Sequence, residues 1–198
     1  MKDILKALVK KEALFVIVLL SIVIRFIAIN QSLWLDEAIG ATVVKNFSFK
    51  DIITRFPLTD NHPPLYYLTL KAWTDLYGYS EIALRSLSVL FGVLTVVFIY
   101  KVAEVFDSSK KVIFPLLSAL FLATSPIHIY YSQEARMYVM AGFLATAAIY
   151  YFLKVTRQKG NIWQWVAFSI FYTTLVFTDY VPVFLYPIFP LYALLKNK

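Results

Sequence analysis

The sequence lacks several residue types from which soluble enzymes build their sites. It has no cysteine, which excludes disulfides, thiolate metal sites and cysteine nucleophiles. Its five glycines are isolated from one another, so it has no glycine-rich phosphate loop. Only two histidines are present, His62 and His128, which excludes a histidine-rich metal site. A soluble nucleotide-dependent enzyme is therefore not expected.

Charged residues are also few, and apolar residues are abundant. Charged residues make up 16% of the chain, against 60% hydrophobic and 18% aromatic residues. Apolar windows of the length that ~30 Å of hydrocarbon requires recur along the sequence. We therefore predict an all-α, polytopic helical membrane protein. Its about six transmembrane helices are expected near residues 11–29, 82–105, 111–126, 136–155, 162–178 and 181–195. The first of these lacks a signal-peptide cleavage site and is predicted to be a retained anchor.

The net charge of +7 does not indicate nucleic-acid binding. The basic residues form separate clusters that flank the apolar spans, such as Lys10 with Lys11 and Lys110 with Lys111. A nucleic-acid footprint would be one continuous basic face, whereas flanking clusters fit the positive-inside rule. We therefore expect no nucleic-acid partner and place both termini in the cytoplasm. A prokaryotic cell membrane is the expected location, and an endoplasmic-reticulum membrane fits the same pattern.

A long outer loop, about 30–80, separates the first two predicted spans. Within it, "WLDEAIGATVVKNF" and "SFKDIITRF" carry apolar residues at helical spacing and predict short amphipathic helices on the bilayer. The segment 63–78 is short for a span and carries Lys71 and Asp75 in its middle. Charges are costly at membrane depth, so we predict a juxtamembrane helix there. No internal repeat or linker is present, and 1–198 is expected to be a single domain.

Two adjacent carboxylates, Asp36 and Glu37, stand in "LWLDEAIG" at the edge of the first span. Neighbouring carboxylates close to hydrocarbon repel each other and require cations or hydrogen-bond donors, which is typical of a functional site. The alternative is structural: Asp36 could simply cap the helix that follows Leu35.

Further polar residues gather in the segments predicted to face outward. "SPIHIYYSQEARMY" brings Gln133, Glu134 and Arg136 to a membrane boundary, where a guanidinium is suited to phosphate recognition. A structural Glu–Arg pair inside an aromatic belt would give the same pattern. Arg85 lies about one turn into a span and needs an anion or a polar cavity, unless it snorkels to the headgroups. "NHPPLYY" adds His62 and Tyr66 as substrate-binding candidates.

Taken in order, "LWLDEA", "NHPPLYY", "EIALRSLSVLFGVLTV" and "SPIHIYYSQEARMY" resemble the N-terminal part of the membrane-embedded GT-C glycosyltransferases. The similarity is to the prokaryotic relatives of protein O-mannosyltransferases and aminoarabinose transferases, and it runs from about residue 10 to 180. It implies transfer of a sugar from a polyprenyl- or dolichyl-phosphate donor to a protein, lipid or glycan acceptor at the outer face, usually with inversion.

The resemblance also implies roles for individual residues. Asp36 corresponds to the general base that takes the acceptor's proton, and Glu37 shapes the site beside it. Arg85 corresponds to an arginine expected at the donor phosphate. Glu134 and Arg136 correspond to the second outer loop, which closes over the same cavity.

Other possibilities stay open at the level of sequence. Relatives usually have further spans, so the chain is expected to be a truncated or split module, or one that works with a partner subunit. A non-catalytic subunit or a carrier that binds a lipid-linked sugar phosphate is the alternative to an enzyme. No resident metal is expected, although an acid-rich site with one histidine is compatible with a divalent cation.

Overall fold

The computed structural model describes residues 2–58, 60–107, 113–158, 160–185 and 187–196, and in them it contains helices and no strand. The predicted all-α architecture is therefore confirmed. The elements are α1 (Lys2–Phe26), α2 (Leu35–Asn46), α3 (Phe49–Thr54), η1 (Phe56–Leu58), α4 (Leu65–Tyr77), α5 (Glu81–Phe106), α6 (Ile113–Ala123), α7 (Pro126–Ser132), α8 (Tyr138–Arg157), α9 (Ile162–Thr178), η2 (Val181–Leu185) and α10 (Ile188–Lys196).

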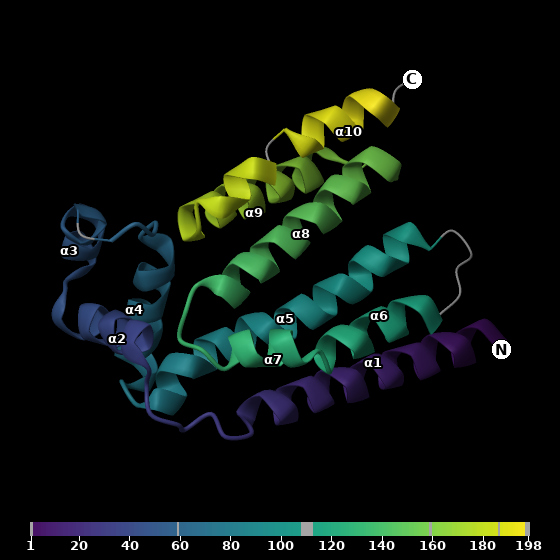
Figure 1. Cartoon of the computed structure of the whole chain (residues 1–198). Coiled ribbons are helices and arrows are strands. Elements are labelled where there is room, and N and C mark those ends of the chain that lie inside the picture. The colour runs from purple at the N-terminus through teal and green to yellow at the C-terminus, as the bar shows by residue number, and fades with distance from the viewer. Residues whose placement is uncertain (1, 59, 108–112, 159, 186, 197–198) are drawn as a thin grey trace.

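The long helices run side by side as a bundle, and three short helices cover one end of it (Figure 1). α5 lies at the centre, in contact with α1, α6 and α8, and α8 packs in turn against α9. α2, α3 and α4 gather at one end of the bundle, whereas both chain termini lie at the opposite end. The two ends of the bundle therefore differ, and the polar outer-loop segments belong to the end that α2–α4 cover.

Two helices, α5 and α8, are each long and apolar enough to cross a membrane. A third crossing is obtained if α6 and α7 count as one span, broken by a bend of 58°. α9 is a shorter apolar helix. The expected span at 181–195 divides into η2 and α10, and the first residues of the expected span at 111–126 lie outside the described residues. The number of about six crossings stays a prediction.

The outer surface of the bundle is apolar, as helices that face lipid require. On α1, Phe15 is 67% exposed, and on α9, Trp163 is 74% exposed, with many similar side chains along both helices. A soluble protein rarely leaves such continuous apolar surface in water. Hydrocarbon solvates this surface without cost, which agrees with the polytopic membrane architecture.

The amphipathic segments between residues 30 and 80 form helices, as predicted. Ser48 caps α3 by accepting a hydrogen bond from the backbone N–H of Asp51 (3.1 Å), and the Asp51 carboxylate accepts one from the backbone N–H of Ser48 (3.3 Å). α4 has 13 residues, about 20 Å at the α-helical rise, which is too short to span ~30 Å. Gly78 ends α4 with a φ of +91°, a conformation that suits glycine.

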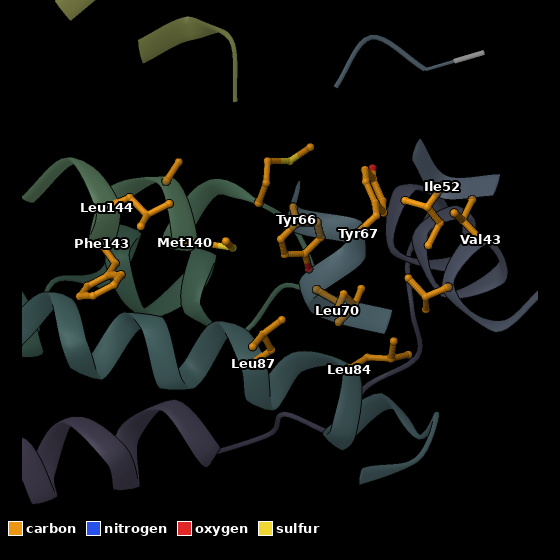
Figure 2. Close-up of a cluster of buried hydrophobic side chains, with 14 of the residues drawn as sticks. Val43, Ile52, Tyr66, Tyr67, Leu70, Leu84, Leu87, Met140, Phe143 and Leu144 are labelled. Atoms are coloured by element: carbon orange, nitrogen blue, oxygen red, sulfur yellow. The ribbon is translucent and has the colours of Figure 1, made fainter. Parts of the chain in front are cut away.

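The main core lies where α4 meets the bundle. Figure 2 shows Tyr66, Tyr67 and Leu70 of α4 pointing into the space between α5 and α8 on one side and α2 and α3 on the other. These three side chains are each at most 1% exposed. Burial of large aromatic and aliphatic groups at this junction fixes α4, and with it the segment between α1 and α5, on the end of the bundle.

A second buried centre joins α1, α6 and α7 through Arg25. Its guanidinium donates to the carbonyl of Ala123 at the end of α6 (3.1 Å), to the Ser132 hydroxyl (3.1 Å) and to His128 Nδ1 (2.7 Å). α6 thus ends at a residue whose free carbonyl is capped by a side chain from another helix. Gly92 of α5 lies against this centre, where a Cβ would overlap the Ser132 hydroxyl.

Candidate functional site

α2 places the two adjacent carboxylates in different environments. The helix begins at Leu35 with Trp34 as its N-cap, so Asp36 is not the capping residue. Glu37 takes part in capping instead, because its carboxylate accepts a hydrogen bond from the backbone N–H of Trp34 (3.3 Å). Glu37 is fully buried, whereas 37% of the Asp36 side chain is exposed. Of these two adjacent carboxylates, Glu37 is therefore buried and Asp36 is accessible.

Arg85 meets Glu37 in a two-pronged ion pair. Arg85 Nε donates to Glu37 Oε1 (2.9 Å) and Nη2 donates to Oε2 (2.6 Å), with both side chains buried. The other N–H groups of Arg85 reach the backbone carbonyls of Ile29 (2.8 Å), Gln31 (2.6 Å) and Ser32 (3.2 Å). A guanidinium has five N–H donors, and each of them has a protein acceptor here.

Arg85 thus has both the anion and the cavity that one sequence-based interpretation required, although the anion is Glu37 of the same chain. The side chain turns into the protein and is 5% exposed, so it does not snorkel to the headgroups. No N–H group of Arg85 is left for a phosphate, so the structure lends no support to the expected phosphate role. Arg85 instead fixes the chain between α1 and α2 against α5.

Glu37 also ties in the segment before α8. The backbone N–H of Ala135 donates to Glu37 Oε1 at 2.7 Å. Glu37 therefore joins α2, α5 and the loop that carries Glu134 and Arg136, three segments that are far apart in the sequence. Loss of one partner of a buried pair of this kind typically costs about 3–5 kcal/mol.

Asp36 and Arg136 form a looser pair. Arg136 Nη2 lies 3.5 Å from Asp36 Oδ2, and the Arg136 side chain is 7% exposed. Within the described part of the chain, Arg136 Nε is buried without a hydrogen-bond partner. The guanidinium also lies 5.7 Å from the centre of the Tyr138 ring. Arg136 therefore has one buried N–H group without a hydrogen-bond partner in the described residues, next to the accessible Asp36 carboxylate.

Tyr67 connects this pair to the diproline turn. Burial raises the pKa of Tyr67 to about 12; the nearby charge of Arg136 opposes this rise, and the carboxylates of Asp60 and Asp36 add to it. Asp60 accepts hydrogen bonds from the His62 ring Nδ1 (2.6 Å) and from the His62 backbone (2.8 Å). The charged groups of three separate segments therefore surround one tyrosine that stays protonated at neutral pH.

Sequence reasoning named Tyr66 and missed Tyr67 and Asp60. The Tyr66 ring is buried in the core between α4 and α5, and its hydroxyl lies by that of Ser88. Adjacent tyrosines on a helix point in different directions, so the sequence cannot say which of them reaches the charged cluster. The pairing of Asp60 with His62, two residues apart before a rigid turn, was the available signal.

A cavity with both polar and apolar walls lies next to Glu37 and Arg85. Its volume is about 260 Å³, and its walls include Trp34, Tyr130, Gln133 and Glu134. The Gln133 amide donates to the carbonyls of Arg25 (3.2 Å) and Ile27 (2.6 Å), which holds the end of α1 at the cavity. Asp36 does not line the cavity.

Most of the predicted site residues are thus brought together in two neighbouring groups, whereas Tyr66 lies in the core. Glu37, Arg85, Gln133 and Glu134 line the cavity. Asp36, Arg136 and Tyr67 lie together, with the Asp60–His62 pair close by. Across the described residues, no group of three or more histidine, aspartate or glutamate side chains is arranged to hold a metal ion.

Comparison with known families decides the class of protein. The family model for dolichyl-phosphate-mannose-protein mannosyltransferase matches residues 61–198, well over half of the chain. The chain belongs to this mannosyltransferase family. No curated protein and no solved structure matches the chain. The GT-C resemblance is therefore confirmed, and the chain is a membrane-embedded member of a glycosyltransferase family.

The family match covers most of the candidate site but not all of it. His62, Tyr66, Arg85, Gln133, Glu134 and Arg136 lie inside the matched range, and Asp36 and Glu37 lie before it. The roles of Asp36 and Glu37 in this mannosyltransferase-family chain therefore depend on the geometry of the site.

Proposed function

We propose that this chain transfers a sugar from a polyprenyl-phosphate donor to an acceptor hydroxyl at the outer membrane face, with Asp36 as the general base. The observation that carries the proposal is the difference between two adjacent carboxylates. Glu37 is buried and fully hydrogen-bonded, whereas Asp36 is accessible and its described ion-pair partner, Arg136, lies at 3.5 Å. Only Asp36 is free to accept a proton from a substrate.

In the proposed reaction, the acceptor oxygen attacks the anomeric carbon of the sugar. The bond between that carbon and the lipid phosphate breaks, and the electron pair leaves with the phosphate. The acceptor proton moves to the Asp36 carboxylate, which contributes roughly 10² to 10⁴ in rate for a general base in position. A single displacement of this kind inverts the anomeric carbon.

Arg136 is the residue that we assign to the departing phosphate. Its buried Nε lacks a hydrogen-bond partner within the described residues, and negative charge develops on the phosphate as the bond breaks. A guanidinium placed where charge develops stabilises the transition state more than the ground state. The assignment moves the phosphate role from Arg85, whose five donors are engaged, to Arg136.

Tyr67, His62 and Asp60 complete the proposed acceptor side. Tyr67 keeps its proton far above neutral pH, so it can donate a hydrogen bond. Asp60 fixes the orientation of the His62 ring. We assign these groups to the positioning of the acceptor next to Asp36, and Tyr66 to the packing that supports Tyr67.

The proposed site faces outward, with both termini in the cytoplasm. Two observations support this orientation. Both chain ends lie at the end of the bundle opposite α2–α4 (Figure 1). The basic clusters flank the spans in the pattern that the positive-inside rule requires for that orientation.

The test is sugar transfer by the full chain in liposomes, from a panel of radiolabelled polyprenyl-phosphate sugars. The family's name makes dolichyl-phosphate mannose the first donor and a protein hydroxyl the first acceptor. Asp36→Asn is compared with Asp75→Asn, which removes an exposed carboxylate from α4 outside the site. We expect transfer to be lost in Asp36→Asn alone. Equal transfer by the two variants would remove Asp36 as the base.

The second candidate is a non-catalytic subunit that binds a lipid-linked sugar phosphate. It is favoured by the same unpartnered Arg136 Nε, which would bind the phosphate in either case. A chain of this kind would bind the donor, lose binding in Arg136→Gln, and show no transfer with either Asp or Asn at position 36.

A further inference from the structure

The last turns of α5 and α8 carry basic side chains that have no part in the candidate site. Both helices end at the end of the bundle opposite α2–α4 (Figure 1). Lys101 lies near the end of α5, and Lys154 and Arg157 lie in the last turn of α8. Because α5 and α8 are each long and apolar enough to cross a membrane, their ends fall at the boundary between hydrocarbon and head groups. The three cations therefore share one membrane interface.

Two of these cations meet at one aromatic ring. Lys101 Nζ and Lys154 Nζ each lie 5.8 Å from the centre of the Tyr150 ring, and Lys101 Nζ also lies 4.6 Å from the centre of the Phe98 ring. The Phe98 and Tyr150 rings contact each other edge to face, with their centres 5.7 Å apart. All four side chains are partly buried. The two rings thus bring ammonium groups from different helices to one place.

The positive charges have no acidic partner of their own. Within the described residues, none of the three cations forms an ion pair. Glu104 is close by on α5, and its charge reaches Tyr150, but its carboxylate already pairs with Lys10 and accepts a hydrogen bond from the Tyr100 hydroxyl (3.2 Å). Asp107, the C-cap residue of α5, is also engaged. The acids at this end of α5 therefore leave the cations uncompensated.

The aromatic contacts do not neutralise these charges either. A ring attracts a cation through its quadrupole but has no net charge, so two cations at one ring still repel each other. An anion bound between Lys101 and Lys154 removes that repulsion. The Tyr150 hydroxyl has no hydrogen-bond partner within the described residues and adds a donor. Two ammonium groups and a hydroxyl at one place form a donor set that suits a phosphate.

Arg157 extends this donor set towards the edge of the bundle. Its guanidinium lies 4.2 Å from the centre of the Phe106 ring at the end of α5, and its Nε donates to the Tyr192 hydroxyl (3.1 Å). Its two Nη groups make no hydrogen bond within the described residues. They form the planar pair of donors that a guanidinium uses to bind phosphate oxygens.

The surroundings of the cluster are those of a membrane lipid. Trp163 and Trp165 lie at the start of α9, which follows α8 in the chain, and both are exposed. Exposed tryptophans of this kind are typical of the level of the head groups. Ile149, next to Tyr150 on α8, is exposed as well and continues the apolar outer surface of the bundle. An anion at Tyr150 therefore lies at head-group depth, beside a surface that contacts acyl chains.

We propose that this basic–aromatic cluster, formed by Lys101, Tyr150, Lys154 and Arg157, binds the head-group phosphate of an acidic glycerophospholipid. The acyl chains of the lipid lie along the apolar surface of the bundle, and its head group joins α5 to α8. Basic sites between transmembrane helices hold acidic head groups in this way. The cluster lies at the end of the bundle opposite the candidate site, so the proposal is independent of the transfer reaction.

The experiment measures lipid binding to the full chain in detergent by native mass spectrometry. Phosphatidylglycerol and phosphatidylcholine are added at equal concentrations, because both contain a phosphate but only phosphatidylglycerol has a net negative charge. The variants are Lys101→Gln, Lys154→Gln, the two combined, and Tyr150→Leu, which keeps the net charge. Lys11→Gln is the matched control, because Lys11 is an exposed lysine of α1 outside the cluster. Unfolding midpoints verify that each variant is folded.

We expect wild type to bind one phosphatidylglycerol saturably and at least about 10-fold more tightly than phosphatidylcholine. Each single lysine variant should weaken phosphatidylglycerol binding by about 5-fold, and the double variant by about 25-fold. Tyr150→Leu should weaken it as well, whereas Lys11→Gln should bind like wild type. Phosphatidylglycerol should raise the unfolding midpoint of wild type but not that of the double variant, because a ligand that binds only the folded chain stabilises it.

The proposal is overturned if Lys101→Gln and Lys154→Gln weaken phosphatidylglycerol binding no more than Lys11→Gln does, because total charge alone would then govern binding. Equal affinity of wild type for the two lipids also overturns it. Displacement of phosphatidylglycerol by an equal concentration of inorganic phosphate overturns the lipid assignment, since the cluster would then be a site for a soluble anion.

Discussion

Glu37 and Asp36 are joined by one peptide bond, yet the regions around them are built in opposite ways. Glu37 is buried and accepts four hydrogen bonds, two from Arg85 and one each from the backbone N–H groups of Trp34 and Ala135. Asp36 is partly exposed, and its ion pair with Arg136 spans 3.5 Å. A region whose polar groups are all satisfied holds segments together, whereas a region with free polar groups has the capacity to bind and react.

The two arginines repeat the contrast. All five N–H groups of Arg85 donate hydrogen bonds to protein acceptors. In contrast, the buried Nε of Arg136 has no hydrogen-bond partner in the described part of the chain. Substitutions in the Glu37 region should therefore change stability first, and substitutions in the Asp36 region should change transfer first.

The largest change in stability is expected for Glu37→Gln. The substitution keeps the shape of the side chain but leaves the Arg85 guanidinium buried without its counter-charge, so the free energy of unfolding should fall by about 3–5 kcal/mol. Denaturant unfolding of the reconstituted chain measures this. Asp36→Asn is the matched control and should unfold like wild type. An unchanged unfolding midpoint for Glu37→Gln would mean that the buried pair contributes little to the fold.

Arg136→Gln should separate transfer from stability. Loss of the guanidinium removes the donor assigned to the departing phosphate, so the transfer rate should fall by roughly 10² to 10³ while the unfolding midpoint stays close to that of wild type. Arg55→Gln is the control, because Arg55 is a largely exposed arginine that pairs with Asp51 at 3.2 Å on α3. If Arg136→Gln lowers the transfer rate no more than Arg55→Gln does, the assignment of Arg136 to the phosphate is wrong.

Tyr67→Phe should change how stability depends on alkaline pH. The pKa of Tyr67 is about 12 in the folded chain and near the ordinary value of 10.0 in the unfolded chain. Between these values the unfolded chain has released the proton that the folded chain keeps, so stability falls by up to about 1.4 kcal/mol per pH unit as pH rises. Below pH 10 this contribution is fully present.

Between pH 9.5 and 11.5, the free energy of unfolding should therefore fall less steeply with pH for Tyr67→Phe than for wild type. Tyr77→Phe removes an exposed tyrosine of α4 and should follow wild type. If the free energy of unfolding depends on pH equally in wild type and Tyr67→Phe, burial does not raise the pKa of Tyr67 in the folded chain.

The smallest effect is expected for Asp75→Asn. Asp75 is an exposed carboxylate that pairs with Lys71 at 3.4 Å and accepts a hydrogen bond from the Tyr79 hydroxyl, and an ion pair with a solvent-exposed carboxylate contributes little to stability. Transfer rate and unfolding midpoint should both match wild type. A clear loss of transfer in this variant would extend the functional surface along α4, beyond the Asp36 region.

The helices were largely predictable from the sequence, because apolar spacing reports which face of a helix is buried. The amphipathic segments in the outer loop became α2 and α3, and the juxtamembrane segment at 63–78 became α4. The short helix α7 and its bend against α6 were not predicted. They depend on Arg25, whose contacts with Ser132 and Ala123 span about a hundred residues of sequence.

The candidate site was predictable in its members but not in its pairing. The sequence predicted that Asp36, Glu37, Arg85, Glu134 and Arg136 share one face, and the structure brings them into two neighbouring groups. It did not indicate which carboxylate would meet which arginine. The bonds that decide this join Glu37 to residues 48 and 98 positions away, and side-chain pairing at that separation follows from helix packing rather than from local pattern.

The most direct test of the account is the transfer rate per folded molecule for Asp36→Asn and Glu37→Gln, measured side by side with the same donor and acceptor. The account predicts that Asp36→Asn folds like wild type and transfers about 10² to 10⁴ more slowly, whereas Glu37→Gln is less stable and keeps far more transfer per folded molecule. Full transfer by Asp36→Asn, with the chemical step abolished in folded Glu37→Gln, would contradict it and make the buried carboxylate the base.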